Sequence, residues 1–301
     1  MSTIASPPRQ RFRIGRAGAW VLVGVIVLIT LFPFYWMLRT SFSTNGALPS
    51  HSNSLLPAES TLDAYRRVLG LSSVSEALEK GGSTASVDFW RYLRNSFIVA
   101  VSTTVVQTMF SALAAYAFAR MRWPGRHVVF TIFLSALMVP PIFTTLPNFI
   151  LIRDLGLLNT FLGIVLPNLL MSPFAVFFLR QFFLNISTEI EEAARLDGAG
   201  HLRTFFRVIV PMSAAPITTL AILTYVAAWN DYFWPLLVGQ DENVRVLTVA
   251  LGIFKAQTPN GGGPDWAGLM AATVIAALPV IILFTLLGKR VINSIQFSGV
   301  K

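Results

Sequence analysis

The sequence has 301 residues, of which 54% are hydrophobic and only 12% are charged. Soluble domains carry about twice that share of charged residues, so this composition indicates a protein whose solvent is largely lipid. The net charge is +9, but no basic run interleaved with aromatic residues occurs, which argues against a nucleic-acid-binding protein. The absence of cysteine excludes disulfides and thiolate metal sites, and three widely separated histidines disfavour a histidine-based metal site.

The first apolar segment covers residues 17–38 and follows Arg9, Arg11, Arg13 and Arg16. It is longer than the roughly 7–15 apolar residues of a signal peptide, and no small-residue cleavage pattern follows it. We therefore expect a retained transmembrane span, preceded by a short N-terminal segment over residues 1–16.

The polar segment after this span covers residues 40–95. Within it, "TLDAYRRVLG" places Leu62, Tyr65 and Val68 at helical spacing, which predicts a short helix at the membrane surface. "KGGSTAS", from Lys80 to Ser86, is typical of a flexible loop. The sequence gives residues 70–88 no role, and no separate soluble domain or internal repeat is evident.

Five further segments approach the roughly 20 apolar residues that a membrane helix needs. They cover residues 96–119, 128–150, 158–179, 212–238 and 270–288. The sequence therefore predicts an all-α polytopic membrane protein with six transmembrane helices over residues 17–288 and a C-terminal tail over residues 289–301. The third span contains Pro140, Pro141 and Pro147, which predict either a simple kink or a break whose free carbonyls face protein or a water-lined cavity. In the second case the prolines shape a pore.

The basic residues predict the orientation. If the N-terminus is inside, the inner segments hold most of the 23 cations and few of the 14 acids. The positive-inside rule then places both termini in the cytoplasm. The loop between the fourth and fifth spans, residues 187–211, is cytoplasmic in this topology.

That loop begins with the charged stretch "STEIEEAARLDGAG", from Ser187 to Gly200. Thr188 and Glu191 have the spacing of a capping box, so a helix is expected to start near Glu189. Glu191 and Arg195 are four residues apart in the favourable order for an ion pair. The apolar residues share the opposite arc of the helix and need a surface to pack on: Ile190, Ala193, Ala194 and Leu196. A second helical stretch, "HLRTFFRVIV", leads to Pro211. The stretch is either a connecting loop or a docking helix for a cytoplasmic partner.

A few polar residues lie within the predicted spans and are candidates for a solute pathway. They are Thr103, Thr104, Gln107, Asn168, Ser172, Asn230 and Asp231. Hydrogen bonds between helices explain such residues equally well. Asp231 is the single acid within a predicted span, although its position in span five puts it near the outer surface, beside aromatic residues typical of the interface.

Several enzymatic classes lack support. No G-x-x-x-x-G-K-[ST] phosphate-binding loop occurs, so ATP hydrolysis by this chain is not expected. No acid–base or nucleophile constellation is evident, which argues against a membrane enzyme. A self-sufficient secondary transporter stays open as an alternative, although such proteins often contain inverted repeats and several intramembrane ionisable groups.

The segment "EEAARLDGAGHLRTFFRVIVP" resembles the EAA loop of ABC-importer permeases. The family pattern falls on Glu192, Ala193, Ala194, Gly198, Val208, Val210 and Pro211, with valine at two positions where the family has isoleucine and leucine. Further segments, among them "LFPFYWMLRTSF", "RYLRNSFIVA" and "WNDYFWPLL", resemble the MalG-like branch of carbohydrate importers. This likeness extends from about Leu31 to the C-terminus, but residues 70–88 form a longer segment than that branch leads us to expect.

The resemblance implies an inner-membrane permease subunit that forms half of a pathway for sugar uptake. Its implied partners are a second permease subunit of a different sequence, two cytoplasmic ATPases, an external sugar-binding protein and membrane lipid, but no nucleic acid. No cofactor or metal is expected on this chain, and ATP with magnesium belongs to the ATPases. A polyol, a glycerophosphodiester or another small solute is the alternative cargo.

The resemblance also assigns the EAA loop as a coupling helix that the ATPase binds. The expected docking residues are Glu191, Glu192, Ala193, Ala194, Asp197, Gly198 and Pro211. Glu192 is expected to pair with a basic group of the ATPase, or else to remain a solvated residue served by Arg195.

Overall fold

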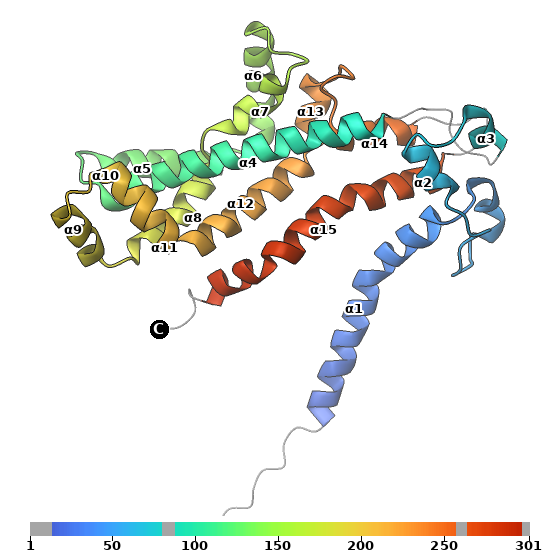
Figure 1. Cartoon of the computed structure of the whole chain (residues 1–301), viewed down its shortest axis with the longest axis horizontal. Coiled ribbons are helices and arrows are strands. Elements are labelled where there is room, and N and C mark those ends of the chain that lie inside the picture. Colours follow the sequence, from blue (N-terminus) through green and yellow to red (C-terminus); the bar gives the residue numbers. More distant parts are fainter. Residues whose placement is uncertain (1–13, 80–87, 257–263, 297–301) are drawn as a thin grey trace, which may run out of the picture. The chain divides into compact units, whose positions relative to one another are not determined.

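The computed structural model describes residues 14–79, 88–256 and 264–296 (Figure 1). Every regular element in these ranges is a helix, which confirms the predicted all-α class. The chain divides into two compact units, one from residues 1–84 with 258–274 and the other from residues 85–257 with 275–301. The predicted loop from Lys80 to Ser86 lies outside the described residues.

The first unit contains one long apolar helix and several short polar elements. These are α1 (Ile14–Ser41), the 3-10 turns η1 (Asn45–Ala47) and η2 (Pro49–His51), α2 (Asp63–Val68), α3 (Val74–Glu79) and the start of α15 (Trp266–Gln296). Large apolar side chains along α1, such as Trp20 and Leu28, are about 70% exposed, and in water this would be unfavourable. The predicted first span therefore lies in a helix suited to lipid, and α2 confirms the predicted helix in "TLDAYRRVLG".

Buried charged groups hold the polar part of the first unit together. Arg39 is 4% exposed and donates to the backbone carbonyls of Leu56 and His51. Nη2 of Arg67 lies 2.9 Å from both carboxylate oxygens of Asp265, whose side chain is fully buried. The described part of the outer segment, residues 40–95, is therefore folded.

The second unit is built on the long helix α4 (Phe89–Arg120). The elements that follow are α5 (Arg126–Ser135), η3 (Ala136–Met138), α6 (Pro141–Asp154), α7 (Phe161–Leu169), α8 (Pro173–Leu184), α9 (Thr188–Leu196), α10 (His201–Thr204), the π-helical segment η4 (Phe205–Ile209), α11 (Val210–Met212), α12 (Ala214–Trp229), α13 (Phe233–Val238) and α14 (Leu247–Ala256). The remainder of α15 completes the unit.

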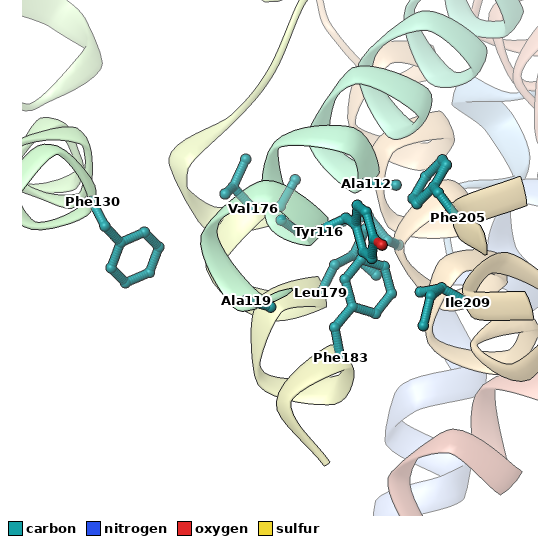
Figure 2. Close-up of a cluster of buried hydrophobic side chains, with 12 residues drawn as sticks. Ala112, Tyr116, Ala119, Phe130, Val176, Leu179, Phe183, Phe205 and Ile209 are labelled. Atoms are coloured by element: carbon teal, nitrogen blue, oxygen red, sulfur yellow. The ribbon is translucent and has the colours of Figure 1, made fainter. Parts of the chain in front are cut away.

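Helix α4 packs against α7, α8 and α12 through small residues. Ala100, Ser111 and Ala115 on α4 have no exposed surface, and their size lets neighbouring backbones approach closely. Towards the C-terminal end of α4, larger side chains from α4, α8 and η4 form a buried apolar cluster that includes Tyr116 and Phe205 (Figure 2). This cluster fixes the segment after α9 against α4.

Three described helices, α1, α4 and α15, are long and apolar enough to cross a membrane. Three helix pairs meet the same criterion together but bend sharply: Arg126–Met138 with α6 by 99°, α7 with α8 by 46°, and His201–Met212 with α12 by 83°. The count of six spans stays a prediction, because it requires each bent pair to cross once.

The helix breaks have local causes, and they correct the predicted spans. Val139 and Pro140 are extended, and Pro141 starts α6, so the third span is broken at these prolines, while Pro147 lies inside α6. The predicted fourth span, residues 158–179, is divided because Ser172 caps α8 and Pro173 begins it.

The last two predicted spans also have different bounds in the structure. The predicted fifth span, residues 212–238, is not one helix. Helix α12 ends at Trp229. The backbone and side-chain nitrogens of Asn230 both donate hydrogen bonds to the carbonyl of Val226. Helix α15 extends beyond the predicted residues 270–288 at both ends, so part of the predicted tail is helical as far as Gln296.

Candidate functional site

A cavity of about 560 Å³ lies between α4, α7, α8 and α12 in the second unit. Its lining is mixed, with polar and apolar residues from all four helices. The lining residues are Val99, Thr103, Gln107, Ile164, Asn168, Ser172, Phe174, Ala175, Leu220, Leu223, Thr224, Ala227, Ala228 and Asp231. A cavity of this size lies in the range of small-molecule sites.

Five of the polar residues singled out in the sequence lie around this cavity: Thr103, Gln107, Asn168, Ser172 and Asp231. Thr103 and Gln107 share a face of α4 because they are four residues apart. The side-chain amide of Gln107 donates to the backbone carbonyl of Asn168 at 2.6 Å, which links α4 to α7. The hydroxyl of Ser172 caps α8 by accepting from the amide of Ala175. Their assignment to a pathway stays a prediction, but the structure does bring them together.

Two other candidates do not line the cavity. The hydroxyl of Thr104 donates to the carbonyl of Ala100 at 2.7 Å, within its own helix. The side chain of Asn230 donates to the carbonyl of Val226 at 2.8 Å and thereby ends α12. Both residues have local structural roles that account for their polar groups.

Asp231 lines the cavity and also has a structural role. Its carboxylate accepts hydrogen bonds from backbone amides at the start of α13, and its backbone carbonyl accepts from the hydroxyl of Thr248 at 2.7 Å. The acid therefore helps to shape the turn between α12 and α13 at one end of the cavity.

Among the lining residues that were not predicted from the sequence, Thr224 is polar and Phe174 is aromatic. Thr224 lies on α12, which ends at Trp229, before Asp231, and its hydroxyl within an otherwise apolar run is the signal that could have found it. Phe174 lies near the start of α8 and is 48% exposed, so it offers an aromatic face beside the polar groups.

Helix α9 starts one residue earlier than expected. The hydroxyl of Ser187 accepts from the amide of Glu189 at 3.3 Å, so Ser187 is the N-cap and the predicted capping box of Thr188 and Glu191 is wrong. The helix ends at Leu196, and Gly198 follows with φ of +78°, a conformation that glycine adopts without strain.

Adjacent glutamates of α9 have opposite environments. Glu191 is 5% exposed and its Oε1 lies 2.9 Å from Nε of Arg120 at the end of α4, so the predicted pairing of Glu191 with Arg195 is wrong. Glu192 is exposed. The apolar side of α9 is left uncovered by this chain at Leu196, which is 89% exposed, and in part at Ile190, which is 36% exposed.

The predicted docking residues are therefore divided between surface and interior. Glu191 is buried and Ala194 is half-buried. The exposed members are Glu192, Ala193, Asp197, Gly198 and Pro211. Among the described residues, no group of three or more histidines, aspartates or glutamates could hold a metal ion.

The comparisons with known proteins match this arrangement of helices. Residues 107–296 match the family described as "Binding-protein-dependent transport system inner membrane component". The chain is 32% identical to the probable ABC transporter permease protein YurM of Bacillus subtilis (strain 168), over 99% of this chain and 93% of that protein.

Two relatives with a stated substrate are similarly close. The trehalose/maltose transport system permease protein MalG of Thermococcus litoralis is 31% identical, over 93% of this chain and 96% of that protein. The sn-glycerol-3-phosphate transport system permease protein UgpE of Shigella flexneri serotype 5b is 30% identical, over 92% and 94%. A solved structure, from a bacterial ABC transporter involved in the import of the acidic polysaccharide alginate, has a TM-score of 0.79 at 27% identity and covers 94% of this chain and 99% of that chain.

The fold and these matches define a permease subunit of an ABC importer. The chain belongs to the family of binding-protein-dependent transport system inner membrane components. The EAA motif in and after α9 is typical of this family, and the ATPase of such importers is a separate subunit.

Proposed function

We propose that this chain forms half of the pathway through which an ABC importer takes up a sugar. The observation that carries the proposal is the cavity, whose lining combines the polar residues Thr103, Gln107 and Asn168 with the aromatic residue Phe174. Sugars present hydroxyl groups to hydrogen-bonding side chains and apolar ring faces to aromatic ones. The relatives named for transport of trehalose and maltose and of arabinooligosaccharides support the same class of cargo.

The charge of the lining favours a neutral sugar over an anionic solute. The described residues that line the cavity include one carboxylate, that of Asp231, and no arginine, lysine or histidine. A phosphate or uronate group needs cationic partners in a low-dielectric site, because burial of an unpaired charge is costly. Import of glycerol phosphate, which one relative performs, is the alternative that this charge pattern disfavours.

The proposed assembly contains a second permease of a different sequence, two cytoplasmic ATPases that bind ATP and magnesium, and an external binding protein. Helix α9 is the docking element for one ATPase, with the exposed side chains of Glu192, Ala193 and Asp197 forming the contact. Six spans with both termini in the cytoplasm put α9 on the ATPase side, consistent with the excess of inner arginines.

Matched substitutions on α4 test the pathway. Thr103→Val removes a cavity-lining hydroxyl, whereas Thr104→Val removes the neighbouring hydroxyl outside the lining. The complex purified through this chain, with its binding protein, is reconstituted in liposomes, and uptake of labelled maltose and of glycerol 3-phosphate is measured.

We expect ATP-dependent uptake of maltose and none of glycerol 3-phosphate. Thr103→Val should lower maltose uptake about 10-fold, because the loss of one hydrogen bond costs roughly 1.4 kcal/mol. Uptake by Thr104→Val should stay near that of the wild type. Equal effects of the two substitutions would contradict the assignment of the cavity, and uptake of glycerol 3-phosphate alone would contradict the neutral cargo.

A further inference from the structure

The proposed docking of an ATPase on α9 raises the question of how motion of this helix reaches the cavity. We propose that the buried ion pair between Arg120 and Glu191 is the positioning contact that transmits movement of α9 to α4, and that it acts separately from the exposed docking face. The proposal rests on the proposed function, because it presumes that α9 binds the ATPase.

The guanidinium of Arg120 contacts the α9 segment at two points. Its Nε lies 2.9 Å from Oε1 of Glu191, and both side chains are 7% exposed. Its Nη2 donates to the backbone carbonyl of Ile186, just before α9 begins. Arg120 thus holds both the first turn of α9 and the chain that leads into it.

The ion pair also fixes the rotation of α9 about its axis. Successive residues of a helix are about 100° apart, so a Glu191 that faces α4 turns Glu192 outward. A buried pair loses much of its solvation energy, and apolar residues of similar volume often stabilise a protein equally well. The two buried charges are therefore better explained by a need to fix the rotation of α9 about its axis than by a contribution to stability.

An apolar contact one turn away supports the same connection. Tyr116 precedes Arg120 by four residues on α4, and its ring centroid lies 5.3 Å from that of Phe205. Phe205 is fully buried and starts the π-helical segment that follows α10 (Figure 2). The end of α4 is consequently held by the segments before and after the exposed face of α9.

Helix α4 continues from this contact to the cavity. Gln107 and Arg120 are both on α4, and 13 residues of helix separate them by roughly 20 Å. An α-helix transmits displacement along its axis because its backbone hydrogen bonds resist stretching. Displacement of α9 would therefore shift the lining residues Thr103 and Gln107 relative to α7 and α12.

Spin labels measure this connection directly in the purified complex with its co-purified ATPase, reconstituted in lipid. The chain has no cysteine, so Arg195→Cys on α9 and Val105→Cys on α4 give a defined pair at exposed positions away from the named docking residues. The distance is measured without nucleotide and after trapping with ATP and vanadate, in otherwise wild-type protein and in Glu191→Gln or Arg120→Gln. Glu189→Gln is the matched control, since Glu189 is an exposed acid of the same helix.

We expect one narrow distance that trapping does not change in wild type and in Glu189→Gln. Glu191→Gln and Arg120→Gln should lose this single distance on trapping while they still co-purify with the ATPase in wild-type amounts. Unchanged distances in both variants would overturn the proposal, as would loss of the ATPase from either variant, because the pair would then belong to docking. A wild-type chain that brings down no ATPase would instead contradict the proposed function.

A double variant separates positioning from folding if the single variants are unstable. Arg120→Met with Glu191→Met removes both buried charges and fills their volume with flexible apolar side chains. We expect this variant to be produced and to retain the ATPase, but to give a broad distance distribution after trapping. A narrow wild-type distance in the double variant would show that the ion pair has no positioning role.

Discussion

Glu191 and Glu192 illustrate how one residue step separates two roles. Glu191 is buried against Arg120, whereas Glu192 is exposed on the same helix. The sequence alone treats both as charged members of a docking helix. The partner of Glu191 lies 71 residues earlier in the chain, on α4, and local spacing rules favoured Arg195 because that residue is one turn away.

Gly198 gives a prediction at the scale of a single residue. Gly198 and Gly200 both have open space where a β-carbon would lie, but only Gly198 has a positive φ, of +78°. Gly198→Ala should therefore destabilise the protein by about 1 kcal/mol, because an L-residue is strained in this conformation. Gly200→Ala should be neutral to within about 0.5 kcal/mol.

Thermal unfolding of the two alanine variants in detergent measures the difference. A lower midpoint for Gly198→Ala alone is the expected result, accompanied by weaker capture of the ATPase because the end of α9 is displaced. Equal midpoints for both variants would mean that the conformation of Gly198 does not hold the turn after α9.

At the level of helices, the breaks within the predicted spans lie at residues that cap a helix. Helices α7 and α8 meet at Ser172, whose hydroxyl caps α8 and whose side chain lines the cavity. Thr160 caps α7 in the same way, with its hydroxyl accepting from the amide of Gly163 at 3.0 Å, but it does not line the cavity. Both residues cap a helix, but of the two only Ser172 lines the cavity.

Alanine substitution of the two caps tests this difference. Ser172→Ala and Thr160→Ala should each destabilise the protein by about 1 kcal/mol through loss of the cap. Only Ser172→Ala should also raise the KM for maltose uptake by the reconstituted complex. An equal rise in KM for both variants would assign the effect to helix stability rather than to contact with the solute.

The sequence predicted the helical class, the short outer helix and the helix after Ser187 because local patterns determine them. It misjudged features that depend on distant or competing groups. Ser187 and Thr188 are both good caps, so spacing alone could not choose between them. The breaks within the predicted fourth and fifth spans depend on Ser172, whose side chain begins a helix, and on Asn230, whose side chain ends one, within otherwise apolar runs.

At the scale of the whole molecule, the chain contributes one part of a transport machine. Its cavity is lined by residues from four helices of one unit, and a lipid-facing helix such as α1 leaves most of its apolar surface uncovered. The exposed apolar side chains of α9, with Leu196 at 89%, are consistent with the proposed docking of a partner. We propose that the cavity, the ion pair and the docking face belong to one path from ATPase to solute.

The cavity residues could be predicted only in part for a physical reason. Thr103 and Gln107 share a face with apolar neighbours, and the sequence marks them as unusual within a span. Thr104 and Asn230 have the same polar character, but their hydrogen bonds close within their own helices. Which polar residue faces a cavity depends on the rotation of each helix, and this is set by packing between helices rather than by the residue itself.

The most direct test of the central claim is purification of the tagged chain from detergent, beside Glu192→Ala, with the ATPase activity of each eluate measured. We expect the wild-type chain to bring down a second permease and an ATPase, and Glu192→Ala to stay folded but to lose most of the ATPase. If the chain instead purifies alone, and alone carries a sugar across liposomes without ATP, it is a self-sufficient transporter rather than a subunit driven by a separate ATPase.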